Sequence, residues 1–236
     1  MAIKMVMFDL DGTLLPMDQD EFVKVYMGLL AQKMAVHGYD PKRLVKSVWA
    51  GTEAMVRNDG LFTNEEVFWR VFRQIHGPEA MKDLPLFDEF YMTDFAGART
   101  ACGFAPQAAE LVKLLKEKGY RLVLATNPLF PAVATRQRIR WAGLRPEDFE
   151  LVTTYENSRH CKPNPDYYRD ILRQTGMKPD ECMMIGNDVG EDMVTKRLGM
   201  QVYLLTDCLI NKKEENISAY PHGSMAELVE YVKENL

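Results

Sequence analysis

Five short apolar runs recur along the chain, and most of them are nearly continuous rather than alternating. Continuous apolar runs are typical of strands that are buried on both faces of a parallel sheet. The predicted strands cover residues 3–8, 120–125, 151–154, 182–185 and 201–205. Helical patterns alternate with them, so the sequence predicts an α/β fold: a doubly wound, Rossmann-like, mostly parallel five-stranded sheet with right-handed crossovers.

Residues that start and stop helices support this alternation. Proline favours the first turn of a helix, asparagine favours the N-cap, and glycine favours the position just after the last turn. Ser224 and Glu227 have the spacing of a capping box for the last helix. The other predicted pairs of opening and closing residues are Pro106 and Gly119, Pro131 and Gly143, and Asn164 and Gly176.

The segment between the first two predicted strands breaks this alternation. Its apolar residues recur at helical spacing, and capping signals divide it into several helices. These helices are predicted to begin at residue 21, at Pro41, after a capping box of Thr63 and Glu66, and at residue 84. The sequence therefore predicts a core domain formed by residues 1–16 and 96–236 and an inserted all-helical cap formed by residues 17–95.

Polar side chains follow the predicted strands at the points where the strands end. In an open parallel sheet, ligands bind beyond the carboxyl ends of the strands, so residues at these ends are expected to meet at one edge. Taken strand by strand, the candidates are Asp9 and Asp11, then Thr126 and Asn127, then Lys162, and finally Asn187, Asp188 and Asp192.

The stretch MFDLDGTLL places Asp9 and Asp11 two residues apart, on the same side of an extended chain. Two carboxylates held this close repel each other, so a cation is expected between them. Mg²⁺ prefers carboxylate oxygens and can also hold a phosphate oxygen, so Asp9 and Asp188 are the predicted metal ligands. Gly12 allows the backbone to turn close to a phosphate.

The same set of residues suits phosphoryl transfer. A carboxylate such as Asp9 can attack phosphorus and form an aspartyl phosphate. Asp11 can give a proton to the leaving oxygen and later take one from water. Thr126, Asn127 and Lys162 are predicted to hold the transferring phosphate oxygens, where fixed polar groups and charge contribute most.

These motifs resemble those of the haloacid dehalogenase superfamily, in its phosphatase branch, and in particular phosphoglycolate phosphatase-like members. MFDLDGTL is similar to the first motif, Thr126 to the second, Lys162 in CKPNPDYY to the third, and GNDVGED to the acidic fourth motif. The resemblance implies Asp9 as nucleophile, Asp11 as acid and base, and Mg²⁺ as cofactor, with the Asp11 backbone carbonyl contacting the metal. It also implies a helical cap inserted after the first motif.

The fourth motif departs from the family pattern, because Asn187 follows Gly186 where the family usually has aspartate. Either Asn187 or Asp188 can therefore be the metal ligand. We expect Asp188, because a second carboxylate neutralises Mg²⁺ better than an amide does, and we expect Asn187 and Asp192 to lie just outside the ligand set. His160 is expected to be exposed or to cap a helix, and Cys161 to be a packed, unreactive thiol.

The composition limits the kinds of binding partner and the location that are expected. The 236 residues carry a net charge of −5 without a block of Lys or Arg, so nucleic acid is not an expected partner. The four cysteines form no CxxC pair, which favours free thiols in a reducing compartment. No apolar run reaches the roughly 18–20 residues that a membrane-spanning helix needs. A cytoplasmic monomer or homodimer acting on a small phosphorylated substrate is expected.

Three functions remain in competition on the sequence alone. A Mg²⁺-dependent phosphatase for a small phosphorylated metabolite leads, ahead of a phosphomutase of the same superfamily and a non-catalytic binding protein with this fold. A dehalogenase is disfavoured, because that chemistry needs neither Mg²⁺ nor a second acid at Asp11. Four cap residues are candidates for selecting the substrate, with no choice among them: Trp49, Arg57, Trp69 and Arg73.

Overall fold

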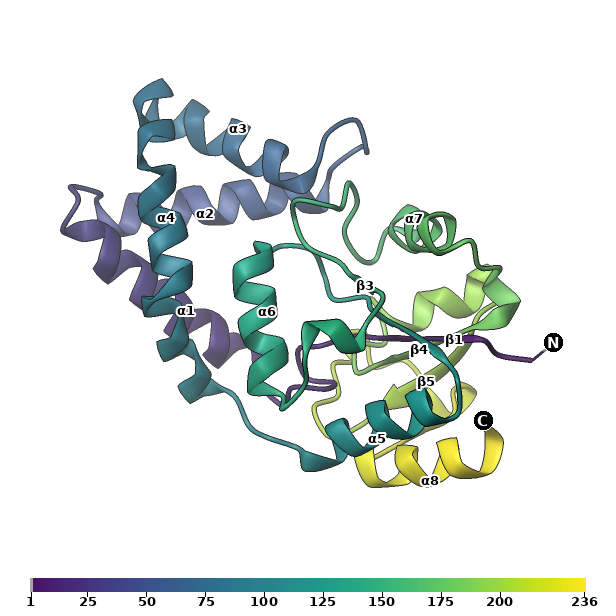
Figure 1. The fold of residues 1–236 in the computed structure, drawn as a ribbon. Coiled ribbons are helices and arrows are strands. Elements are labelled where there is room, and N and C mark those ends of the chain that lie inside the picture. The colour runs from purple at the N-terminus through teal and green to yellow at the C-terminus, as the bar shows by residue number, and fades with distance from the viewer. Residues whose placement is uncertain (1) are drawn as a thin grey trace.

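The computed structural model describes residues 2–236 and contains a six-stranded parallel sheet (Figure 1). The order of the strands is β3-β2-β1-β4-β5-β6, which is the order of a doubly wound Rossmann sheet. The predicted α/β fold class is thus confirmed. The strands are β1 (Met5–Phe8), β2 (Arg121–Leu124), β3 (Leu151–Val152), β4 (Cys182–Gly186), β5 (Gln201–Leu205) and β6 (His222–Gly223).

The predicted number of strands was wrong by one. The additional strand, β6, has two residues and pairs with the end of β5 at the edge of the sheet. Two residues cannot show a periodic apolar pattern, so this strand could not be predicted from the sequence. The predicted bounds of β5 are correct, whereas those of the other strands differ by one or two residues at their ends.

Burial on both faces explains the continuous apolar runs. All residues of β1 and β4 are buried. Val6 and Phe8 of β1 point into one core cluster, and Met5 and Met7 point into another on the opposite face. The first cluster is covered by α5 (Pro106–Glu117), α6 (Ala132–Trp141) and α8 (Met225–Asn235), and the second by α7 (Pro165–Thr175).

The helix boundaries follow the capping residues. Asn164 accepts a hydrogen bond from the backbone N–H of Asp166 at the start of α7, and Gly176 closes this helix in the left-handed conformation. The predicted capping box of Ser224 and Glu227 is present at the start of α8. Local capping chemistry therefore sets the ends of these helices.

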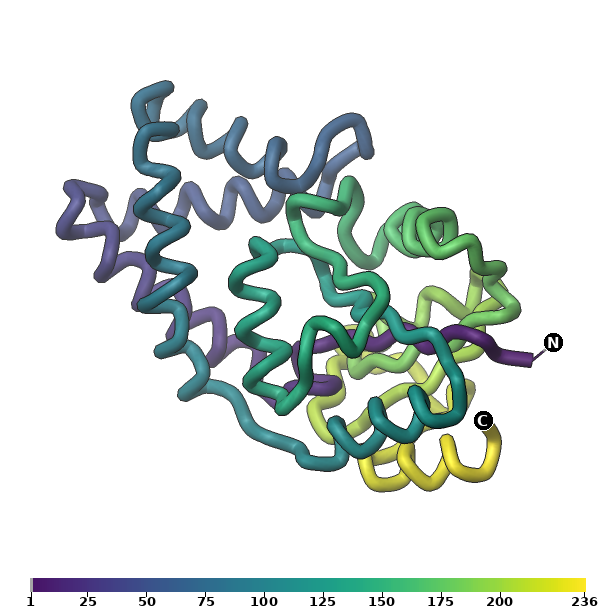
Figure 2. Tube along the Cα trace, in the orientation of Figure 1, coloured from purple at the N-terminus to yellow at the C-terminus, as the bar shows by residue number. Residues whose placement is uncertain are grey.

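The segment between β1 and β2 is helical, as predicted (Figures 1 and 2). Asp40 caps α2 and the box of Thr63 and Glu66 caps α3. A 3₁₀ turn, η2, continues this helical segment past the predicted end at residue 95. The elements that precede α5 in this segment are α1 (Gln19–Ala35), α2 (Pro41–Val56), α3 (Asn64–His76), η1 (Pro78–Asp83), α4 (Leu84–Met92) and η2 (Asp94–Ala101).

The chain passes between the sheet and these helices at two neighbouring points. Gly103 N donates a hydrogen bond to the carbonyl of Pro16 at 2.7 Å, and Met17 forms a bridge with Cys102. The division into a core and a cap formed by residues 17–95 stays a prediction, with the second crossing at Cys102–Gly103. None of the helices within residues 2–236 has the length and apolar character needed to cross a membrane.

Candidate active site

The register of the sheet brings three of the predicted strand ends to one level. Phe8 lies beside Leu124 of β2 and Ile185 of β4. The hydrogen bond from Asp9 N to the carbonyl of Ile185 measures 2.9 Å, and the one from Ala125 N to the carbonyl of Phe8 measures 2.7 Å. The residues that follow these strands therefore start from the same edge of the sheet.

Lys162 is the centre of the site. Its ammonium lies 2.7 Å from Asp9 Oδ1 and 2.7 Å from Asp192 Oδ1, and only 1% of the residue is exposed. Burial alone would lower the pKa of Lys162, but the negative charges of Asp192 and Asp9 outweigh it and raise the pKa well above the usual value. The site therefore holds a permanent positive charge beside the carboxylate of Asp9.

Asp9 and the fourth motif are joined through Thr13. The Thr13 hydroxyl lies 3.3 Å from Asp9 Oδ2 and 3.0 Å from Asn187 Oδ1. The amide nitrogen of Asn187 donates to the carbonyl of Cys208 at 2.6 Å. Gly12 has a φ of +85°, and a Cβ at this position would lie 2.3 Å from Asn187 Nδ2. Only glycine allows this approach, and both ends of the Asn187 amide are in use within the protein.

Asp188 has a different environment from its neighbour. It is partly exposed, whereas Asn187 is 1% exposed. Its Oδ1 accepts hydrogen bonds from the backbone N–H groups of Gly190 at 2.7 Å and Glu191 at 3.0 Å. No hydrogen bond from residues 2–236 engages its second oxygen, Oδ2. Asp192 Oδ2, in turn, accepts a hydrogen bond from Asp188 N at 3.0 Å.

Asn127 ties the second, third and fourth motifs together. Its Oδ1 accepts a hydrogen bond from the backbone N–H of Lys162 at 3.3 Å, and its Nδ2 donates to Glu191 Oε2 at 3.1 Å. The adjacent Thr126 is 2% exposed, and its carbonyl accepts hydrogen bonds from the hydroxyls of Thr153 and Tyr167. Hydrogen bonds within the described part of the chain thus connect Asp9, Asn127, Lys162, Asn187, Asp188 and Asp192, whereas Asp11 and the hydroxyl of Thr126 stand outside this network.

Sequence reasoning missed Arg138 of α6. This arginine is fully buried and forms an ion pair through Nη1 with Asp11 Oδ2, and its guanidinium lies 4.4 Å from the centre of the Phe130 ring. Burial raises the pKa of Asp11, although the positive charge of Arg138 acts in the opposite direction. One feature of the sequence could have indicated that Arg138 is buried. Ala134 and Arg138 are four residues apart, so they lie on the same face of the helix, and this face is buried.

Asn64, the first residue of α3, is the second residue that the sequence did not reveal. It is fully buried and crosses from the helical insertion to the sheet domain. Its amide nitrogen lies 3.2 Å from the carbonyl of Pro128, 3.4 Å from that of His160 and 3.3 Å from Cys161 Sγ. Asn64 therefore contacts the segments just after Asn127 and just before Lys162.

The structure also shows the surroundings of His160 and Cys161. His160 was expected to be exposed or to cap a helix, and this was wrong: its ring pairs with Asp170 of α7 at 2.8 Å, and only 14% of the side chain is exposed. Cys161 is buried, and burial raises the pKa of its thiol to about 12, as expected for an unreactive thiol.

The four cap candidates lie in different surroundings. Trp69 is buried and its indole N–H lies 3.5 Å from the hydroxyl of Tyr155 in the sheet domain. Arg57 pairs with Glu53 on its own helix at 2.7 Å. Trp49 and Arg73 are exposed. Within the described residues, no hydrogen bond or ion pair links these four to the cluster around Lys162.

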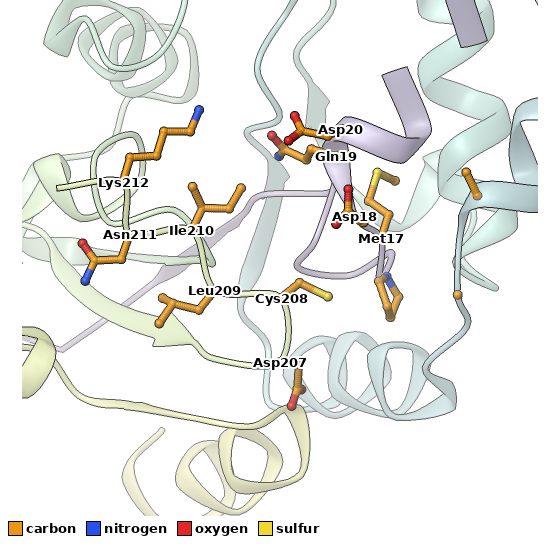
Figure 3. A pocket seen from close by; sticks show the side chains of 13 residues that line it. Met17, Asp18, Gln19, Asp20, Asp207, Cys208, Leu209, Ile210, Asn211 and Lys212 are labelled. Atoms are coloured by element: carbon orange, nitrogen blue, oxygen red, sulfur yellow. The ribbon is translucent and has the colours of Figure 1, made fainter. Parts of the chain in front are cut away.

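A cavity of about 830 Å³ lies where the start of the helical segment meets the loop after β5 (Figure 3). One wall is formed by residues 16–20, together with Ala101 and Gly103, and the other by residues 207–212. The second wall is fixed to the fourth motif, because Ile210 N donates to the carbonyl of Asn187 and Val189 N donates to that of Ile210, each at 2.9 Å. The cavity therefore lies next to the site cluster.

The donor set suits a hard cation that keeps part of its own water shell. Within residues 2–236, no group of three or more His, Cys, Asp or Glu side chains is placed to hold a metal ion by itself. Mg²⁺ usually takes one or two protein carboxylates together with water and a substrate phosphate, so such a group is not required. Asp9 and Asp188 are carboxylates that follow neighbouring strands, and Asp188 Oδ2 is available as a donor.

The family of this chain is shown by comparison with known proteins. A family model described as haloacid dehalogenase-like hydrolase matches residues 3–194. The chain belongs to this family. The match runs through the first strand, the helical insertion and the fourth motif, so this haloacid dehalogenase-like hydrolase carries all four motif regions within the matched segment.

Two curated relatives of this hydrolase cover most of its length. The phosphoglycolate phosphatase of Shigella dysenteriae serotype 1 is 26% identical over 208 residues, which cover 84% of this chain and 79% of that protein. The glyceraldehyde 3-phosphate phosphatase of Methanothermobacter thermautotrophicus is 21% identical over 238 residues, which cover 91% of each chain.

Solved structures support the fold. The crystal structure of 2-haloacid dehalogenase from Pseudomonas syringae pv. Tomato DC3000 matches with a TM-score of 0.62 and 18% identity, covering 98% of this chain and 99% of that one. A dehalogenase thus shares the fold of this haloacid dehalogenase-like hydrolase. The fold alone does not choose between dehalogenation and phosphoryl transfer, and the site residues have to decide.

Proposed function

We propose that this protein is a Mg²⁺-dependent phosphatase that hydrolyses the monoester of a small phosphorylated metabolite through an aspartyl phosphate on Asp9. The observation that carries the proposal is the buried Lys162 ammonium, which lies 2.7 Å from Asp9, while the backbone N–H of Lys162 donates to Asn127. A fixed positive charge and polar groups beside a carboxylate suit a transferring phosphoryl group. The names of the two curated relatives, both phosphatases, support the same substrate class.

The reaction can be written with the residues of this chain. An oxygen of Asp9 attacks phosphorus, the bond between phosphorus and the leaving oxygen breaks, and Asp11 gives a proton to that oxygen. Lys162, Thr126 and Asn127 hold the phosphoryl oxygens. Water then attacks the aspartyl phosphate, its proton passes to Asp11, inorganic phosphate leaves, and the carboxylate of Asp9 is restored.

Three groups would hold the metal: the carboxylates of Asp9 and Asp188 and, by family resemblance, the backbone carbonyl of Asp11. When bound, Mg²⁺ supplies positive charge that offsets the repulsion between these carboxylates and a phosphate anion. Asp188 is favoured over Asn187 because its Oδ2 is not engaged by the described residues, whereas the Asn187 amide is already bound at both ends.

The choice between the two neighbours can be tested by titrating activity against Mg²⁺. We expect Asp188→Asn to weaken Mg²⁺ binding strongly, with partial recovery of activity at high Mg²⁺. Asn187→Ala is expected to perturb the loop through Thr13 and Cys208 without a comparable rise in the Mg²⁺ requirement. The reverse pattern would move the metal ligand to Asn187.

The reaction class is tested with 4-nitrophenyl phosphate and a panel of small phosphate monoesters, by measuring released phosphate with Mg²⁺ and with a chelator. We expect Mg²⁺-dependent release, and Asp9→Asn should lower turnover by at least about a thousandfold, or roughly 4 kcal/mol in the barrier. The exposed Asp88 provides the matched control, Asp88→Asn. An Asp9→Asn enzyme with a tenth of the wild-type activity would exclude the aspartyl phosphate. Isomerisation of a sugar phosphate without release of phosphate would indicate a mutase instead.

A further inference from the structure

The four motifs do not explain the ion pair between Arg138 and Asp11. Arg138 has no exposed surface, and Asp11 Oδ2 accepts the hydrogen bond from its Nη1. A second donor of Arg138, Nη2, lies 3.3 Å from the hydroxyl of Thr135, one turn earlier in α6. A buried guanidinium is costly to desolvate, so an arginine here needs a compensating role.

The two oxygens of Asp11 are not equivalent. Oδ2 is bound to Arg138, whereas Oδ1 is buried without a hydrogen-bond partner among residues 2–236. Buried acceptors are normally satisfied, so an orphan oxygen at a candidate active site marks a place where a reacting group belongs. The ion pair therefore leaves one defined carboxylate oxygen, Oδ1, for a ligand.

Arg138 is itself held in place by the cap and the core together. Its guanidinium lies over the ring of Phe130. The centre of this ring lies 5.2 Å from the ring centre of Tyr26 and 6.2 Å from that of Phe22, both in α1. Gln137, its neighbour in α6, donates to the carbonyl of Tyr91 in α4. Figure 1 shows α6 between the cap helices and the sheet. The arginine thus has little freedom to leave Asp11.

We propose that Arg138 is a positioning residue for proton transfer: it fixes Asp11 through Oδ2 so that Oδ1 alone exchanges the proton with the leaving oxygen and with water. This inference rests on the proposed phosphatase function. In the first step Asp11 Oδ1 loses its proton to the leaving oxygen as the phosphorus–oxygen bond breaks and the bond to Asp9 forms. In the second step the attacking water returns a proton to Oδ1, and the bond between phosphorus and Asp9 breaks.

The test uses two substrates that differ in how much they need a proton. The nitrophenolate of 4-nitrophenyl phosphate leaves without protonation, whereas the alkoxide of an alkyl phosphate does not. The first chemical step is followed in single turnovers by release of nitrophenolate or alcohol. We expect Arg138→Met to slow cleavage of the alkyl phosphate about a hundredfold and that of 4-nitrophenyl phosphate less than about threefold, because acid catalysis typically contributes 10²–10⁴.

A double-mutant cycle shows whether Arg138 acts through Asp11. In an Asp11→Asn background, adding Arg138→Met should change neither rate by more than about threefold, since the group it positions is gone. This double variant also removes both buried charges, so it is expected to fold even where Arg138→Met is destabilised. Arg138→Lys, which keeps the charge and one donor, should recover at least about tenfold of the alkyl rate relative to Arg138→Met. The control is Arg140→Met, an exposed arginine in the same helix.

The outcomes separate the two proposals. If Arg138→Met slows both substrates equally, or if its effect adds to that of Asp11→Asn, Arg138 is only structural and the inference is overturned. Failure of the phosphatase proposal looks different: Asp9→Asn would then retain the release of nitrophenolate, whatever Arg138 does. A selective loss with the alkyl phosphate that disappears in the Asp11→Asn background supports both proposals.

Discussion

Replacing Asp192 by asparagine tests how the buried ion cluster supports the site. Asp192 is 1% exposed, and its two oxygens serve two donors: Oδ1 the ammonium of Lys162 at 2.7 Å and Oδ2 the backbone N–H of Asp188 at 3.0 Å. The side chain packs directly against Gly186, where a Cβ would lie 2.1 Å from Oδ2. Asparagine would thus occupy the same space with one acceptor fewer.

The magnitude follows from counting donors and acceptors. The asparagine oxygen can accept from either Lys162 or Asp188 N, and in both orientations its NH₂ group faces the other donor. The protein loses one hydrogen bond to a charged group, worth about 1.5–3 kcal/mol, and keeps Lys162 paired only with Asp9. We expect a loss of about 2–4 kcal/mol, or about 4–16 °C in Tm for a chain of this size.

Calorimetry and Mg²⁺ titration of activity measure the two consequences. Because Lys162 is then drawn toward Asp9 alone, kcat should fall about 10- to 100-fold while the Mg²⁺ concentration at half-activity changes less than about twofold. Asp88→Asn on the exposed face of α4 is the control for the same chemical change. An Asp192→Asn protein with the Tm of the wild type would refute the counting of donors. A rise in the Mg²⁺ requirement that matches the fall in activity would place Asp192 among the metal ligands.

Two further predictions concern residues of α3, Asn64 and His76. Asn64→Ala removes a buried amide that contacts the segments just after Asn127 and just before Lys162. Tm should therefore fall, and kcat/KM should fall similarly for every substrate of a panel; unchanged kinetics would show that this contact does not support the site. Burial, with a smaller effect of Arg43, lowers the pKa of His76, so the neutral ring favours the folded state and this stabilisation is lost as the pH falls below the unfolded value of about 6.5. The drop in Tm between about pH 7.5 and about pH 5 should therefore be smaller in His76→Gln than in the wild type, and unchanged in the exposed control His37→Gln.

The parts of the fold that the sequence predicted are those whose signals are local. A strand buried on both faces, such as β1, is a continuous apolar run, and a capping box such as Thr63 with Glu66 spans four residues. The short edge strand β6 has no such signal. Its place comes from pairing with β5, and this contact exists only after the chain has folded.

The candidate site divides in the same way. Asp9, Thr126 and Asp188 could be predicted, because each follows an apolar run and parallel strands end at a common edge. Arg138 could not be paired with Asp11 from the sequence, since 127 positions separate them and α6 carries other arginines. Asn64 contacts Cys161 across 97 positions and has only a helix-start signal of its own. The first contact forms only when α6 packs against the end of β1, and the second only when α3 packs against the segment before Lys162.

The charges of the cluster support the proposed need for a further cation when a phosphate ester binds. Lys162 is shared between two carboxylates and Arg138 is paired with a third. Within residues 2–236, no lysine or arginine forms an ion pair with Asp188 or Glu191, and burial already raises the pKa of Glu191. A phosphate monoester adds about two negative charges at neutral pH. Carboxylates thus outnumber cations before the substrate arrives, and the excess lies on the side of the fourth motif. This imbalance favours a divalent cation between Asp9 and Asp188.

The same imbalance gives a reason for Asn187 to be an amide. A carboxylate in place of Asn187 would add negative charge at a position whose side-chain oxygen faces Thr13 rather than the proposed metal.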